Sequence, residues 1–219
     1  MEMEELKTPH QILWWGGLLW MANAIPGQVL VWDGVGVKVL RWQREDGFPL
    51  HPNSIWCDGE LVYVLEHRGP KMPKWVRVLD MDFETVRSIK ITGRMFKRKR
   101  GVHGVHNVYV ENGMLYMLSP SGVMRLEMES GKSDFTVLNR VGSEEYYVRG
   151  LARTDRFYIG LSEIREREER AEGGSFILVT DDDFNVTEMI RLEGTGALHE
   201  IRVVDGVDRA HNRIPCPYQ

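Results

Sequence analysis

The sequence has little cysteine and lacks the motifs by which many enzymes are recognised. Its 219 residues include two cysteines, Cys57 and Cys216, too few for a disulfide framework and without the spacing of a CxxC metal site. It contains no nucleophile elbow, glycine-rich phosphate loop, Walker sequence or HExxH pattern. A single disulfide between these two cysteines is one alternative. The simpler expectation is that both are reduced, in a reducing compartment.

The chain also lacks an excess of positive charge and a long hydrophobic run. A net charge of −4 gives no global reason to expect nucleic acid or an anionic membrane as a partner. The basic run KRKR at 97–100 is expected to be a solvated loop, because the acidic remainder would repel a polyanion. The apolar run from Ile12 is too short to span a bilayer, and the acidic residues before it do not suit a signal peptide. We therefore expect a cytoplasmic protein.

A repeat is the strongest positive signal in the sequence. Four segments align without a gap: HQILWWGGLLWM from His10, NSIWCDGELVYV from Asn53, HNVYVENGMLYM from His106 and RGLARTDRFYIG from Arg149. Each has a polar or small pair, an apolar residue, a turn rich in Gly, Asp or Asn, and a second apolar run. A fifth, partial copy, HEIRVVDG, begins at His199.

These starting points are 43, 53, 43 and 50 residues apart, and each interval holds further short alternating runs. Such periods are typical of β-propellers, whose blades are four-stranded sheets. The sequence therefore predicts an all-β fold, a small β-propeller with four or five blades in one domain spanning 1–219. A β-sandwich is the alternative, and the internal repeat speaks against it.

The partial fifth copy leaves the number of blades open. Either a partial fifth blade closes the ring, or a strand from His199 pairs with N-terminal strands to complete a four-bladed ring. In the second case the copy at His10 is displaced. The charged stretch SEIREREERAEGG from Ser162 is expected to be an excursion between the second and third strands of its blade.

The first strand of each blade lines the propeller axis, so residues at its start form a ring at one channel mouth. The leading positions carry His10, Asn53, His106, Arg149 and His199. The positions that follow carry Gln11, Ser54, Asn107, Gly150 and Glu200. Polar and titratable groups gathered in a concave place predict a ligand site.

This ring suits three kinds of chemistry. His106, His199 and His10, with Asn53 or Glu200, could hold a divalent transition metal. Without a metal, the ring and Arg149 would suit a carboxylate, phosphate or sugar acid. As an enzyme, the chain would use His106 or His199 as base and Arg149 to stabilise negative charge.

Other residues are candidates for the surroundings of this site or for separate sites. His51 and His103 lie just upstream of ring positions and are candidates for its surroundings. We predict that Asp181, Asp182 and Asp183 form a tight solvated turn rather than a cation site. Trp14 and Trp15 are adjacent, so in a strand one of them must face outward, where it could stack on a sugar or contact a partner.

Segments from residue 50 to residue 208 resemble an uncharacterised family of conserved hypothetical, propeller-like proteins. The family pattern runs H-x-N, P-H-S-P, R-G-L, V-G-L-S-K-[IV]-R and E-I, and its closest match here is RGLARTDRFYIGLSEIR. The sequence departs from the pattern at Val105 and at Asn107-Val108. The resemblance implies the propeller fold and a site at the matching residues, which are His51, Asn53, His106, Arg149, Ser162, Arg165 and Glu200. The family has no established activity, so the reaction stays open.

The sequence therefore predicts that a small polar ligand, anionic or sugar-like, binds at the ring. The predicted ligand-binding residues are Asn53, Asn107, Glu200, His51 and His10, and the predicted catalytic residues are His106, Arg149 and His199. The sequence leaves open whether a divalent metal ion is a cofactor. The alternative is a scaffold that binds a protein partner, with the polar ring as a structural plug.

Overall fold

Strands dominate the computed structural model, which describes residues 6–25, 27–42, 50–67, 74–91, 104–204, 207 and 209. Within these residues the only helical segment is one short 3-10 helix, η2 (Arg167–Glu172). It lies between β15 and β16, so the charged stretch is an excursion between two strands, as predicted. The basic run at 97–100, His103 and Cys216 lie outside the described residues.

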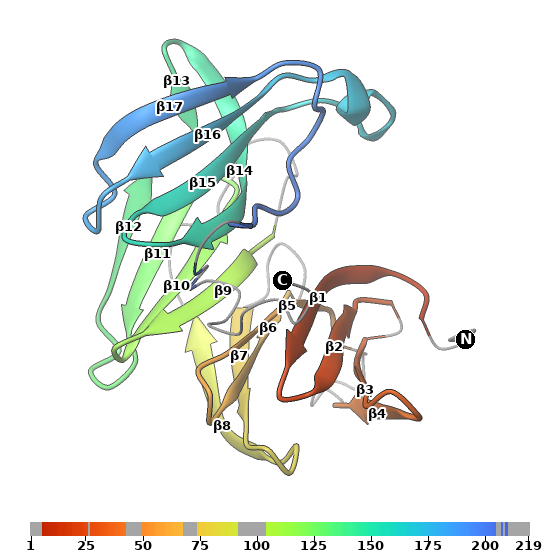
Figure 1. Cartoon of the computed structure of the whole chain (residues 1–219). Coiled ribbons are helices and arrows are strands. Elements are labelled where there is room, and N and C mark those ends of the chain that lie inside the picture. Colours follow the sequence, from red (N-terminus) through yellow and green to blue (C-terminus); the bar gives the residue numbers. More distant parts are fainter. Residues whose placement is uncertain are drawn as a thin grey trace. The chain divides into compact units, whose positions relative to one another are not determined.

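The strands form four antiparallel sheets whose members follow one another in chain order (Figure 1). The first sheet contains β1 (Pro9–Trp15), β2 (Leu18–Asn23), β3 (Gln28–Trp32) and β4 (Val37–Arg41). The second contains β5 (Pro52–Cys57), β6 (Val62–Glu66), β7 (Lys74–Leu79) and β8 (Thr85–Ile91).

The third sheet contains β9 (His106–Glu111), β10 (Met114–Ser119), β11 (Gly122–Glu127) and β12 (Ser133–Val137). The fourth contains β13 (Arg140–Val141), β14 (Glu144–Arg153), β15 (Phe157–Glu163), β16 (Ser175–Thr180) and β17 (Val186–Leu192). Four-stranded meanders of this kind are the blades of a propeller. The first four repeat copies supply β1, β5, β9 and β14, the leading long strand of each sheet.

The fifth copy differs from this expectation. Within the described residues, no strand forms around His199, and the first sheet is complete without it. Of the two alternatives left open for this copy, a strand from His199 that completes the first sheet and displaces the copy at His10 is not the one formed in the described residues, because β1 leads a four-stranded sheet of its own. In the first sheet, β2 pairs with β3 and β3 pairs with β4, so the sheet has four strands without any from the fifth copy.

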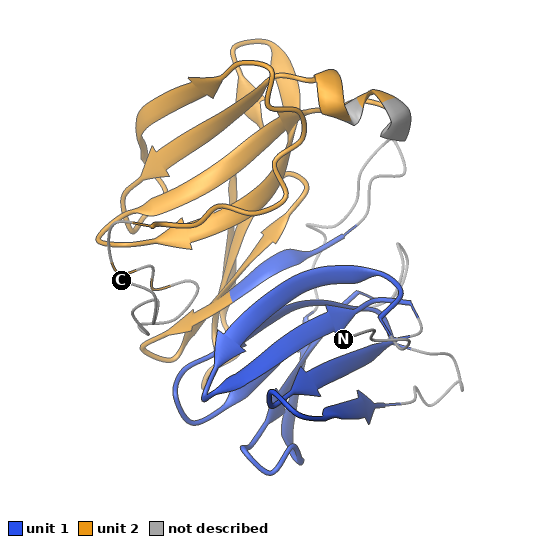
Figure 2. Ribbon diagram, turned by 45° about the vertical axis from the view of Figure 1, so that its right-hand side comes forward, with its two compact units in different colours: residues 1–108 blue, residues 109–219 orange. Residues whose placement is uncertain are grey.

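The chain divides into two compact units, residues 1–108 and 109–219 (Figure 2). The boundary falls inside β9 after Val108. The N-terminal unit has its own apolar core between the first two sheets, because alternate residues of both sheets are apolar there. This core is formed by Leu13, Trp20, Ala22, Val29, Val31, Leu40, Ile55, Cys57, Val62, Val64 and Leu79.

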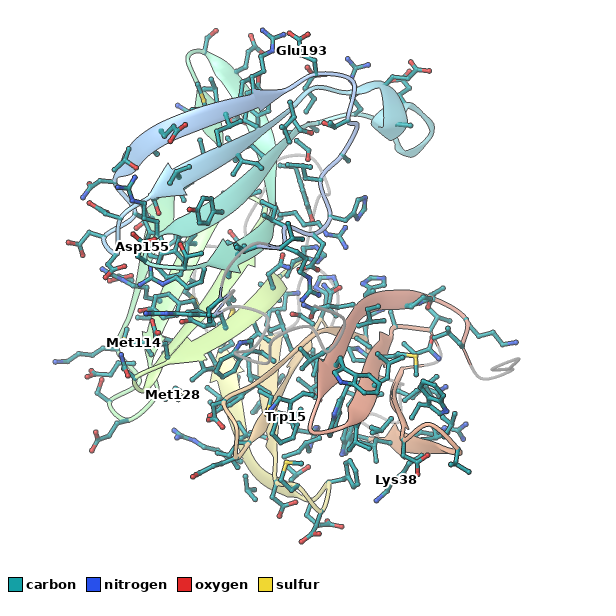
Figure 3. The ribbon with its side chains drawn as sticks, viewed as in Figure 1. Trp15, Lys38, Met114, Met128, Asp155 and Glu193 are labelled. Atoms are coloured by element: carbon teal, nitrogen blue, oxygen red, sulfur yellow. The ribbon has the colours of Figure 1, made fainter. Side chains whose placement is uncertain are left out.

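The adjacent residues Trp14 and Trp15 of β1 face opposite sides of the first sheet. Trp15 packs against this core, and its position on the first sheet is labelled in Figure 3. Its neighbour Trp14 points to the other face and is 44% exposed. The prediction that one of the two faces outward is confirmed.

Two tight turns, one in each unit, share the same sequence pattern and hydrogen bonds. Residues 80–84 read DMDFE and residues 181–185 read DDDFN, and in both the first aspartate accepts backbone N–H bonds from the third and fifth residues. Phe83 and Phe184 adopt left-handed backbone conformations, with φ of 70° and 62°. The prediction of a tight turn at Asp181 is confirmed.

The phenylalanine of each turn packs under a cation. Lys38 Nζ, on a residue labelled in Figure 3, lies 3.9 Å from the ring centre of Phe83, and Arg125 Cζ lies 5.6 Å from that of Phe184. Cation–π contact and burial together stabilise this otherwise unfavourable backbone.

Candidate functional site

Three of the five leading positions come together in the N-terminal unit. His10 lies near the start of β1, Asn53 near the start of β5, and His106 is the first residue of β9. Asn53 and His106 are only 4% and 8% exposed, whereas His10 is half-buried. Three sheets thus contribute one polar side chain each to the same place.

Asn53 connects the two histidines through its side-chain amide. Its Nδ2 donates to the Val105 carbonyl oxygen at 2.6 Å and lies 3.0 Å from His106 Nδ1. Its Oδ1 accepts from His10 Nδ1. Rotating the amide by 180° would place two oxygens against each other at Val105, so the amide has one orientation.

This orientation fixes the protons on both rings. His10 carries its proton on Nδ1, because Asn53 presents an acceptor there, and His106 must accept on Nδ1 and carry its proton on Nε2. A Cβ added at Gly104 would lie 2.8 Å from His106 Nε2, so only glycine leaves room for this ring. His106 is therefore held as a neutral imidazole.

The residues that follow the first two leading positions form a second set of buried hydrogen bonds. Gln11 Oε1 accepts from Ser54 Oγ at 2.6 Å and from the Ile55 backbone N–H at 2.7 Å. Ser54 Oγ in turn accepts from the Val108 backbone N–H at 3.0 Å. Gln11 and Ser54, which follow the first two leading positions, thus each bind the backbone of the next repeat copy and join neighbouring blades. A structural role is therefore enough to explain why these polar side chains are buried, because they hydrogen-bond within the fold.

Two more histidines extend the group of His10, Asn53 and His106. The His51 ring lies edge-on to His10, with centroids 4.9 Å apart, and to His67, with centroids 5.7 Å apart. All three rings are half-buried. Burial, with a smaller contribution from the nearby charge of His10, lowers the pKa of His51 from 6.5 to about 4. We call His10, His51, Asn53, His67 and His106 the histidine cluster.

His67 was not predicted as a site residue. It lies outside the repeat pattern, one position after β6, and it reaches His51 because its backbone N–H donates to the His51 carbonyl oxygen at 2.8 Å. A hairpin contact of this kind between residues sixteen apart leaves no periodic signal in the sequence. The repeat identified only residues at equivalent positions.

Lys74, the first residue of β7, is an unusually buried cation in this unit. The last pair in the β6–β7 ladder joins Glu66 to Trp75, so Lys74 starts β7 at the level of His67. Burial lowers the Lys74 pKa to about 8. The buried carboxylate of Glu66 is engaged by Arg77, whose Nε lies 2.9 Å from Glu66 Oε1.

Asn107 is the remaining predicted ligand residue of the N-terminal unit. It is buried and has a left-handed backbone conformation, with φ of 51°. Asparagine tolerates this region better than most residues, which explains its place beside His106. Its predicted role in ligand binding remains a prediction.

The other two leading positions belong to the C-terminal unit. Arg149 is half-buried within β14, and His199 is exposed and follows β17. Glu200 Oε1 lies 3.8 Å from Arg202 Nε. The prediction that Arg149 and His199 share a ring with His10, Asn53 and His106 therefore remains a prediction.

The segment around His199 packs against β14 and β15 of the fourth sheet. Ser162 Oγ accepts from the Leu198 backbone N–H at 2.8 Å. A Cβ added at Gly150 would lie 3.1 Å from the Ile201 side chain. Ile201, in the apolar slot of the fifth copy, thus packs beside Gly150, the second position of the fourth copy.

Arg165, which matches the family pattern, pairs with Glu163. Arg165 Nη2 lies 2.7 Å from Glu163 Oε2, and this bond lowers the pKa of Glu163. The pair is partly exposed, so it contributes little to stability.

Among the described residues, no group of three or more His, Cys, Asp and Glu side chains could hold a metal ion. In the N-terminal unit, His10 and His106 both turn Nδ1 toward the Asn53 amide. These contacts leave Nε2 of His10 outside the Asn53 hydrogen bond, so the prediction that His10 and His106 ligate a metal remains a prediction. A metal shared with His199 is a separate prediction that involves the other unit.

Neither a protein-family model nor a curated protein matches the chain. Solved structures do: a chain of a nidogen/laminin complex aligns over 90% of this chain and 68% of its own length, with a TM-score of 0.59 and 11% identity. A chain of a mitotic checkpoint complex aligns over 86% and 56%, with a TM-score of 0.51 and 15% identity. The WD40 domain of Neurospora crassa Pan2 aligns over 86% and 51%, with a TM-score of 0.51 and 11% identity.

WD40 repeats are four-stranded propeller blades, so the predicted fold is confirmed: the chain is an all-β propeller. Its length spans 51% to 68% of these three chains. Identities this low establish the fold alone and transfer no activity. In the described part of the chain, no helix has the length and apolarity needed to cross a membrane.

Proposed function

We propose that the chain binds a small polar ligand, sugar-like or anionic, at the histidine cluster of the N-terminal unit. The observation that carries this proposal is the contrast within the cluster. Asn53 and His106 are buried and hydrogen-bonded, whereas His10, His51 and His67 are half-buried rings gathered beside them. A rigid polar base with solvent-accessible imidazoles above it is a common arrangement in ligand sites.

The cluster offers both acceptors and donors to such a ligand. His10 donates Nδ1–H to Asn53, so the nitrogen turned away from Asn53 is an acceptor in the neutral ring. The depressed pKa of His51 keeps that ring uncharged at neutral pH. Hydroxyl groups, which donate and accept, complement neutral imidazoles. In this proposal His106 and Asn53 position the other rings and do not touch the ligand.

A second candidate, a structural role for the polar residues, is favoured by the second set of hydrogen bonds. Gln11 and Ser54 join neighbouring blades, and Asn53 bridges three sheets. If the histidine cluster has the same purpose, the chain is a scaffold and the cluster is its polar plug. An outer surface would then hold a protein partner.

Thermal unfolding in the presence of candidate ligands separates the two. A ligand that binds only the folded chain raises the melting temperature with concentration. We expect a neutral sugar or an oxyanion to stabilise the wild type, and the His10→Ala variant to keep its melting temperature in buffer but lose this response. The His199→Ala variant, altered in the other unit, tests whether the C-terminal segment takes part.

If no sugar, sugar acid or phosphate ester stabilises the protein, the binding proposal fails. If His10→Ala unfolds the N-terminal unit, the structural role is correct instead. All seven tryptophans lie between residues 14 and 75, so tryptophan fluorescence reports on the N-terminal unit alone.

A further inference from the structure

The chain continues past β17 and lies against the fourth sheet in residues 194–204, which we call the strap. The strap forms no strand. Its first turn contains two glycines in the left-handed conformation, Gly194 and Gly196, with φ of 64° and 67°. Glycine reaches this region without strain, and small residues often lie where a segment changes direction or moves. Individual contacts, rather than a strand ladder, therefore hold the strap on the sheet.

Two serine hydroxyls of the fourth sheet bind the backbone of the strap. Ser175 Oγ, on β16, donates to the Gly196 carbonyl oxygen. Ser162 Oγ, on β15, accepts from the Leu198 backbone N–H at 2.8 Å. Both serines are buried. Contacts to the backbone do not depend on the side chains of the bound segment, so they suit the binding of an extended peptide.

Two apolar side chains of the strap lie over glycines of the sheet. A Cβ added at Gly160 on β15 would lie 3.2 Å from Leu198 Cδ1. A Cβ added at Gly150 on β14 would lie 3.1 Å from Ile201 Cγ1. Leu198 and Ile201 are half-buried in these positions. The sheet thus leaves room for two apolar side chains three residues apart, and this spacing adds sequence selectivity to the backbone contacts.

We propose that this surface of β14, β15 and β16 is a binding site for an extended peptide of a partner protein, and that the strap occupies the site in the free chain. The partner's peptide has the pattern of the strap: a small residue, an apolar residue two positions later and a second apolar residue three positions after that. The site lies within the C-terminal unit, so this inference is independent of the ligand proposed for the histidine cluster.

The strap competes with any added peptide because it is part of the same chain. Beyond the strap, Arg209 has a contact of its own, with Nη1 3.1 Å from Glu111 Oε1, so a displaced strap stays close to the sheet at both ends. A tethered segment of this kind competes at an effective concentration on the order of millimolar. Weakening the strap should therefore raise the apparent affinity for a peptide added in solution.

The test uses the full chain and a fluorescently labelled peptide with the sequence of the strap, GTGALHEIRVV, and follows binding by fluorescence anisotropy. Ile201→Asp places a carboxylate over Gly150 and weakens the chain's own strap. We expect this variant to bind the peptide at least about tenfold tighter than the wild type does. Leu198→Asp acts at the other apolar position and has the same expected result.

A second pair of variants tests the serine contact. In the Ile201→Asp background, Ser162→Ala removes the acceptor for the peptide N–H and should weaken peptide binding about threefold to tenfold. Ser143→Ala, at an exposed position between β13 and β14, should leave binding unchanged. Equal effects of the two serine substitutions would contradict the proposed site.

Three further results would overturn the inference. One is the absence of peptide binding to both strap variants while near-ultraviolet circular dichroism shows a folded C-terminal unit. Another is unfolding of the C-terminal unit in both variants, because the strap would then be an integral part of the sheet. The third is equal binding of a control peptide that carries Leu198→Asp and Ile201→Asp, because binding would then not use the two apolar positions.

Discussion

Acid should destabilise the N-terminal unit through His51, and His51→Gln should remove most of that effect. The folded protein holds the pKa of His51 at about 4, whereas the unfolded chain has the ordinary value of 6.5. The unfolded chain therefore binds a proton first as the pH falls. Stability is complete above pH 6.5, declines below it, and reaches its lower limit near pH 4.

The size of the effect follows from the two pKa values. A difference between 6.5 and 4 corresponds to about 3.4 kcal/mol of lost stability. The ring is partly exposed to solvent, which screens its interactions, so about 2 kcal/mol is the expected loss. Glutamine keeps a polar side chain at this position and does not titrate.

Urea unfolding at pH 8, 6, 5 and 4 measures this loss directly. Tryptophan fluorescence isolates the N-terminal unit, because no tryptophan lies beyond residue 75. We expect the stability difference between pH 8 and pH 4 to be about 2 kcal/mol smaller in His51→Gln than in the wild type. The comparison must be made without sulfate or phosphate. Equal losses in the two proteins would refute the assignment of a depressed pKa to His51.

Three further substitutions test the packing of the blades. Ser54→Ala removes the acceptor of the Val108 N–H and should lower the stability of the N-terminal unit by about 1–3 kcal/mol in urea unfolding; no loss would mean that this bond is not made. Phe184→Ala removes a buried ring and should cost about 3 kcal/mol, seen in near-ultraviolet circular dichroism of the C-terminal unit with tryptophan fluorescence unchanged. Gly160→Ala places a Cβ 2.2 Å from the Arg149 carbonyl oxygen and should cost about 3 kcal/mol or more in the same assay. Gly36→Ala, in the N-terminal unit, has open space and should stay within about 0.5 kcal/mol by tryptophan fluorescence; similar costs for the two variants would contradict the close approach at Gly160.

The strands could be predicted from the sequence because the repeat and the two-residue alternation act together. The copies at His10, Asn53, His106 and Arg149 each became the leading long strand of a sheet. The turn at Asn112 and Gly113, with φ of 51° and 76°, is the hairpin that the Asn-Gly pair favours. The copy at His199 forms no strand in the described residues, which shows that a sequence pattern alone does not make a strand.

The candidate site was less accessible to prediction. The equivalence of leading positions suggested that His10, Asn53 and His106 meet, and the structure brings them together. The direction of their hydrogen bonds depends on the Val105 carbonyl oxygen, a backbone group that has no sequence signature. His67 joins through a hairpin rather than through the repeat. Periodicity identifies equivalent residues, but contacts between non-equivalent ones need the folded chain.

The central claim, that the histidine cluster binds a ligand above a rigid base, is tested most directly by NMR of the imidazole nitrogens and ring protons. In the free protein, His10 should be protonated on Nδ1 and His106 on Nε2. On addition of a stabilising sugar or of an oxyanion, we expect the signals of His10, His51 and His67 to shift and those of His106 to stay unchanged. Unchanged signals of all three rings with every ligand, under conditions where the protein stays folded, would contradict it.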